Sequence, residues 1–129
     1  MAIAWVHPGQ ANEDSNAWLA HIANGAGLIE PSLWPLELAN ALLVLQRRRK
    51  ITAGERGEAL TLLAAIPAVI DHADSERALK ELSALAFAEG LSVYDAAYLD
   101  LSMRLKLPLA CKDGPLSTAA ARRRVRVKP

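Results

Sequence analysis

The sequence predicts an α/β protein in which short buried strands alternate with longer helices. Two observations support this prediction. The chain holds 25 alanines and 21 leucines among 129 residues, and both are strong helix formers. Short apolar runs lie between the segments of helical periodicity, and this alternation favours a parallel sheet covered on both faces. Aromatic residues make up only 5% of the chain, which argues against an all-β sandwich.

Composition and length limit the class of protein further. A chain of 129 residues fits a single domain, and 52% hydrophobic against 22% charged residues predicts a packed core. One cysteine forms no internal disulfide, and the histidines show no spacing typical of zinc ligands. No apolar run reaches the ~18 residues of a membrane span, and the N-terminus does not resemble a signal peptide. We therefore expect a cytoplasmic protein without a membrane partner.

The first half of the chain predicts helices separated by one short strand. Helix-start residues before position 16 and a glycine at position 25 predict a helix over 16–24. A strand is expected over 27–29, and prolines introduce a helix over 36–46. Thr52 and Glu55 match a capping box, which opens a helix that reaches Ile66.

The second half predicts the remaining strands and helices. A strand over 68–70 precedes a helix from Asp74 or Ser75 to Glu89, which Gly90 ends. A second capping box, Ser92 to Asp95, opens a helix to Lys106. The last expected elements are a strand over 107–111, a helix over 117–124 and an edge strand over 125–127.

Positive charge is concentrated in two places. The last eight residues carry five cations, whereas residues 1–121 carry a net charge of −4. Arg122, Arg123 and Arg124 in this tail are candidate contacts for a polyanion such as RNA, and the alternative is that they only complement a helix end. The run from Arg47 to Lys50 offers the same two interpretations.

Three acidic residues are candidates for a catalytic metal site. Glu37 and Asp95 lie in first helical turns, and Asp113 follows a strand; singly, each is explained as a helix cap. Parallel strands place such residues at one edge of a sheet, where like charges repel unless a cation compensates them. Carboxylate oxygens favour Mg²⁺ or Mn²⁺, and such ions activate water for phosphodiester hydrolysis.

Other acidic residues have no motif. Asp100 lies about 140° around the helix from Asp95, so we expect it at the surface or behind the site. Asp71 and Glu89 are expected to be solvated.

Three segments, 30–42, 91–99 and 109–116, resemble the acidic motifs of the PIN-domain family, most closely its VapC-type ribonuclease toxins. Tyr94-Asp95-Ala96-Ala97-Tyr98 is the most specific block. The resemblance implies a three-layer α/β/α fold and a metal-dependent endoribonuclease of a toxin–antitoxin pair. It also implies a cognate antitoxin and a homodimer, with Glu37, Asp95 and Asp113 as catalytic and metal-binding acids.

The chain departs from this family at its start. Family members begin with a hydrophobic strand that ends in Asp-x-Ser, and this aspartate has no counterpart here. We expect that the natural protein begins upstream of Met1, so that the chain is a single PIN-like domain without its first strand. The alternative function is a catalytically inactive PIN-like module that binds an antitoxin without cleaving RNA.

Overall fold

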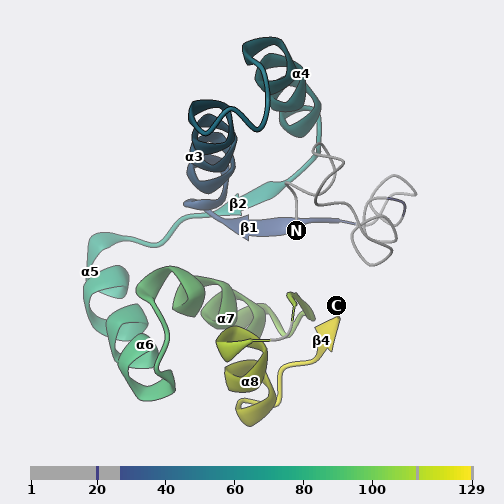
Figure 1. Ribbon diagram of the computed structural model, residues 1–129. Helices are drawn as coiled ribbons and strands as arrows, with labels where there is room; N and C mark the ends of the chain where they lie inside the picture. The colour runs from purple at the N-terminus through teal and green to yellow at the C-terminus, as the bar shows by residue number, and fades with distance from the viewer. Residues whose placement is uncertain (1–19, 21–26, 113, 129) are drawn as a thin grey trace. The chain divides into compact units, whose positions relative to one another are not determined.

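The computed structural model describes residue 20, residues 27–112 and residues 114–128 (Figure 1). This part of the chain is an α/β protein, as predicted. The predicted helix over 16–24 falls almost entirely outside the described residues, and Asp113 lies outside them as well. By its internal contacts the chain forms two compact units. Of the described residues, unit 1 contains 20, 27–29 and 33–69, and unit 2 contains 30–32, 70–112 and 114–128.

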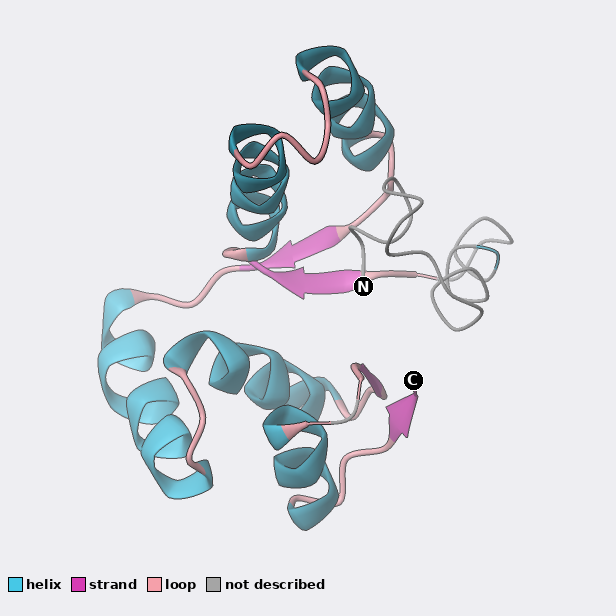
Figure 2. Cartoon of the chain, in the orientation of Figure 1, coloured by secondary structure: helices cyan, strands magenta, loops and turns pink. Residues whose placement is uncertain are grey.

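The strands form two parallel pairs (Figure 2). Strands β1 (Ile29–Pro31) and β2 (Val69–Asp71) are joined by backbone hydrogen bonds. Along both strands the bonded residues follow one another in the same chain direction, which makes the pair parallel. The Val69 amide donates to the Leu28 carbonyl at 2.9 Å, and the Ser32 amide donates to the Asp71 carbonyl at 3.1 Å. Strands β3 (Leu109–Ala110) and β4 (Val127–Lys128) pair in parallel, with Leu109 opposite Val127.

Unit 1 is built on helices α3 (Trp34–Arg47) and α4 (Ala53–Ala64). The predicted capping box is confirmed: the Thr52 amide donates to Glu55 Oε1 at 2.9 Å, and the Glu55 amide donates to Thr52 Oγ1 at 3.1 Å. Both helices bury one apolar face in a shared core. Its fully buried members are Leu42, Ile51, Ala59 and Leu63.

Unit 2 holds the remaining helices, which are α5 (Ser75–Arg77), η2 (Ala78–Leu82), α6 (Ser83–Glu89), α7 (Val93–Leu105) and α8 (Pro115–Arg122). Asp74 caps the first of them, because its carboxylate accepts from the Arg77 amide at 2.8 Å. The core of the unit joins α7 and α8 to strand β3. Its buried members are Leu99, Leu109, Ala119 and Ala120.

The predicted helix from Asp74 to Glu89 contains a π-helical turn, η2, which the sequence analysis did not anticipate. In a π turn each amide bonds five residues back, so the turn holds more residues than an α turn. Leu82 in this turn and Ala86 in the following helix are both buried. The turn therefore lies where the helical segment faces the core.

Three helices end in a residue that adopts the left-handed conformation although it is not glycine. These residues are Arg49 (φ 57°), Lys106 (φ 55°) and Arg124 (φ 59°). After α3, the Arg49 amide donates to the Gln46 carbonyl at 2.9 Å and the Lys50 amide donates to the Leu45 carbonyl at 2.8 Å. This is the Schellman arrangement, in which glycine is the usual left-handed residue. Helix α6 ends in the usual way, at Gly90 with φ 65°.

None of the helices in the described part of the chain combines the length and the apolar character needed to cross a bilayer.

Candidate functional site

Two of the three acids predicted to bind a metal, Glu37 and Asp95, lie at helix starts as expected. Glu37 is exposed in the first turn of α3, within unit 1, and Asp95 is partly buried in the first turn of α7, within unit 2. The third, Asp113, lies outside the described residues, two positions after Cys111. Among the residues that are described, no three His, Cys, Asp or Glu side chains gather as a metal site. The proposed donors are all carboxylates, a set that suits Mg²⁺.

Asp95 does not act as the helix cap that its position suggests. Ser92 Oγ accepts a hydrogen bond from the Asp95 amide at 3.0 Å, which is half of a capping box. The reciprocal bond, from the Ser92 amide to the Asp95 carboxylate, is not formed, whereas its equivalent at Thr52 and Glu55 is. Within the described chain the Asp95 carboxylate makes no hydrogen bond or ion pair. The second capping box was therefore predicted correctly for the Ser92 side chain and wrongly for the Asp95 side chain. The Asp95 carboxylate is available for another ligand.

Asp100 lies in an ion-pair network that the sequence analysis missed. Its carboxylate accepts from Arg77 Nη2 at 2.5 Å and from Arg104 Nε at 2.9 Å, and its side chain is 15% exposed. Arg104 Nη2 also forms an ion pair with Oδ2 of Asp71, at the end of β2, at a distance of 2.6 Å. Arg77 Nη1 forms an ion pair with Glu81 Oε2 at 2.8 Å. The network joins the end of β2 and helix α5 to helix α7, and the Arg77–Glu81 pair joins α5 to η2. Asp71 is thus paired and partly buried, and the expectation that it is solvated is wrong.

The network changes the acidity of its members. Burial raises the pKa of Asp100, but the hydrogen bonds from Arg77 and Arg104 together lower it by more, so its pKa lies below the ordinary value. The hydrogen bonds to Asp71 and Asp100 raise the pKa of Arg104. The charged forms of Asp100 and Arg104 are therefore favoured at neutral pH.

Glu89 forms a second set of ion pairs that the sequence analysis missed. Its side chain is only 7% exposed and its carboxylate accepts from Arg123 Nε at 2.6 Å and from Arg122 Nη2 at 2.7 Å. These hydrogen bonds, first that of Arg123 and then that of Arg122, hold the pKa of Glu89 below its usual range. The expectation that Glu89 is solvated is wrong. Two of the three arginines expected to contact RNA are therefore bound to a carboxylate of the same chain.

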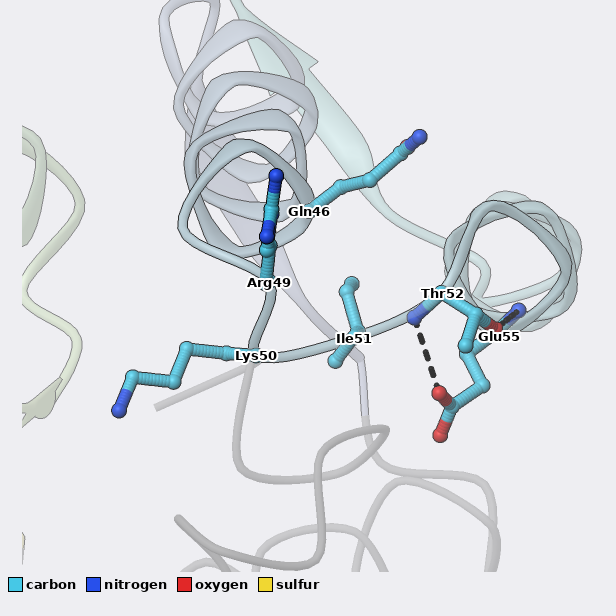
Figure 3. Close-up of a pocket in the computed structure, with 6 residues that line it drawn as sticks. All are labelled: Gln46, Arg49, Lys50, Ile51, Thr52 and Glu55. Carbon is cyan, nitrogen blue, oxygen red and sulfur yellow. Dashed lines mark hydrogen bonds between the residues drawn. The ribbon is translucent and has the colours of Figure 1, made fainter.

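The other basic run lies at the turn between α3 and α4, in unit 1 (Figure 3). A shallow hollow at this turn is lined by Gln46, Arg49, Lys50, Ile51, Thr52 and Glu55. The Arg49 and Lys50 side chains leave the turn in different directions, while Glu55 folds back onto the Thr52 amide. Gln46 accepts a hydrogen bond from Arg56. Arg47 to Lys50 are all exposed, and no carboxylate of the described chain pairs with them.

Comparison with known proteins adds no assignment: no protein-family model matches the chain, and no curated protein matches it.

Proposed function

We propose that the protein is a metal-dependent endoribonuclease of the VapC toxin type with a PIN-like three-layer fold, which hydrolyses RNA phosphodiester bonds. Three family-like segments support the proposal, since each carries an acid at the position that the resemblance requires: Glu37, Asp95 and Asp113. The observation that carries it is the Asp95 carboxylate. This group is partly buried and sits at a helix N-terminus, yet it is not used to cap that helix.

In this proposal the three carboxylates would hold Mg²⁺ or Mn²⁺. The ion, when bound, supplies an acidified water and offsets the charge that develops on the phosphate. The Asp95 carboxylate has unused acceptor positions, so it can orient an attacking water through a hydrogen bond. Glu37 is exposed in the first turn of α3. Basic side chains of the chain would hold the RNA backbone.

The same proposal includes partners. A cognate antitoxin would cover the acids and block RNA, and two copies of the chain would form a homodimer, as the family resemblance implies. The second candidate is the inactive module, which binds an antitoxin but does not cleave RNA.

The test is cleavage of single-stranded RNA by the purified chain with Mg²⁺ and with EDTA. We expect cleavage only with Mg²⁺, and we expect Glu37→Gln and Asp95→Asn each to reduce the rate at least about a hundredfold, because each removes a charged ligand of the metal ion. Matched controls are Glu58→Gln, on an exposed position of α4, and Asp74→Asn, which keeps the cap of α5. Both controls should cleave like the unmodified chain.

Two results would contradict the nuclease. One is the absence of Mg²⁺-dependent cleavage in a folded preparation; binding of a small partner protein without cleavage would then favour the inactive module. The other is unchanged cleavage in both Glu37→Gln and Asp95→Asn, which would trace the activity to a contaminant or to another site.

A further inference from the structure

The α3–α4 turn carries the longest run of consecutive cations in the described chain, and none of these cations has an anionic partner there. Arg47, Arg48, Arg49 and Lys50 are consecutive and exposed. The acid nearest in sequence, Glu55, is engaged in the capping box with Thr52. Four unpaired positive charges on one turn repel one another, and this repulsion is relieved when a polyanion binds.

Arg49 adds a cost to this arrangement. It occupies the left-handed position of the Schellman motif after α3, where a side chain is disfavoured relative to glycine. Lys106 and Arg124 share this conformation, so it does not by itself mark a binding residue. The exposed Arg49 guanidinium makes no ion pair in the described chain, so it has no anionic partner there.

The surroundings of the turn indicate the class of ligand. Across residues 43–61 no large hydrophobic side chain is exposed, and the nearest exposed ones are Leu36 and Leu62. Protein–protein interfaces usually have an apolar centre, whereas contacts with a nucleic-acid backbone are polar and positive. Arg49 and Lys50 point apart rather than into one point (Figure 3), and the Glu55 carboxylate lines the hollow. This geometry suits a chain of phosphates outside the hollow better than a single small anion within it.

The tail differs from this turn in part: Arg124, Arg126 and Lys128 also lack an anionic partner in the described chain, but two tail arginines have one. Arg122 and Arg123 already bind Glu89, so contact with a phosphate would have to compete with that carboxylate. A phosphate at Arg47 to Lys50 would meet no such competing carboxylate among the described residues.

We infer that the α3–α4 turn, through Arg47 to Lys50, is the main contact for the RNA backbone, in place of the Arg122–Arg124 tail. The inference rests on the proposed function for the identity of the polyanion. Unit 1 would then bind the RNA phosphates, and this binding would require neither the metal ion nor cleavage of the RNA.

The test is binding of a fluorescently labelled single-stranded RNA in EDTA, measured by polarisation over a range of KCl concentrations with the full chain. The variant Arg47→Gln, Arg48→Gln, Arg49→Gln, Lys50→Gln should bind at least about tenfold more weakly at low salt. Its plot of log affinity against log salt should be shallower by about 3, since each lost contact with single-stranded nucleic acid contributes about 0.7 to the slope. The variant Arg122→Gln, Arg123→Gln, Arg124→Gln is expected to change the slope by less than about 1.

A pair of single variants controls for folding. Arg49→Gly and Lys106→Gly each remove one cation and relieve one left-handed residue at a helix end. Both should fold at least as stably as the unmodified chain, but only Arg49→Gly should weaken RNA binding, by about twofold or more.

Three outcomes would overturn the inference: unchanged binding in the variant with four substitutions, a larger loss in the tail variant, or displacement of RNA by polyglutamate at equal charge, which would identify an acidic protein as the ligand. The proposed function fails separately. Mg²⁺-dependent cleavage with binding that does not depend on Arg47 to Lys50 contradicts only the inference. Binding through these residues without cleavage contradicts only the nuclease.

Discussion

The two compact units treat their charged residues differently. In unit 2, arginines from α5, α7 and α8 are matched to Asp71, Asp100 and Glu89, and these pairs join segments that are far apart in the sequence. In unit 1, the four cations after α3 have no such partner among the described residues, and its core is apolar. The comparison shows that a count of basic residues does not measure the positive charge that is available to a ligand. An arginine that is already paired with a carboxylate of the same chain is not free to bind a ligand.

The largest expected effect tests whether the pairs of unit 2 are structural. Asp100→Asn leaves Arg77 and Arg104 without their shared anion, so the free energy of unfolding should fall by about 1–3 kcal/mol, less than for a fully buried pair because the site is partly exposed. Urea denaturation at pH 7 measures this change. Glu76→Gln, which removes an exposed pair with Lys80, is the control and should cost under about 1 kcal/mol. Equal stability of Asp100→Asn and the unmodified chain would remove the contrast between the units.

An effect of pH sharpens the same comparison. The pKa of Asp100 is lowered in the folded chain, so its contribution to stability is complete above the unfolded pKa of about 4 and is lost as pH falls through the folded pKa. The difference in unfolding free energy between the unmodified chain and Asp100→Asn should therefore narrow as the pH is lowered below about 4. Denaturation curves from pH 7 to pH 3 measure this difference. A gap that stays constant over this range would show that the charge of Asp100 is not what stabilises unit 2.

The smallest expected effect concerns helix ends in both units. Glycine at position 49 or at position 106 should raise the free energy of unfolding by about 0.5–1 kcal/mol, because the left-handed conformation costs glycine little. Thermal and urea unfolding of the two single variants measure the gain. The prediction is equal for the two positions, so a gain at Lys106 with a loss at Arg49 would show that Arg49 contributes to the packing of unit 1.

Several features of the fold could be predicted because their signals are local. The capping box of Thr52 and Glu55, the end of α6 at Gly90 and the approximate positions of all four described strands follow from residues within a few positions of each other. The π turn and the left-handed cations were not predicted. Helix ends are usually marked by glycine, and here Arg49, Lys106 and Arg124 take that place.

The charge networks were missed for a different reason. Asp100 and Arg104, and likewise Arg77 and Glu81, are four residues apart, and this spacing on a helix was a usable signal. Arg104 and Asp71 are 33 residues apart, and Glu89 is as far from Arg122. No spacing rule connects such positions, because the tertiary fold alone brings them together. Of the candidate site, the sequence predicted the helix-start positions of Glu37 and Asp95, but not that Asp95 leaves its cap half made.

The π turn at Ala78–Leu82 also constrains how the chain tolerates change in length. A π turn accommodates a residue more than an α turn, so deleting one residue there would make the helix more regular. The same deletion would rotate everything on one side of the turn by about 100° relative to the other side. Arg77 would then no longer face Asp100 while Leu82 and Ala86 stay buried. The irregular turn is therefore needed for Arg77 to face Asp100 while Leu82 and Ala86 face the core. We expect insertions or deletions in this segment to be poorly tolerated.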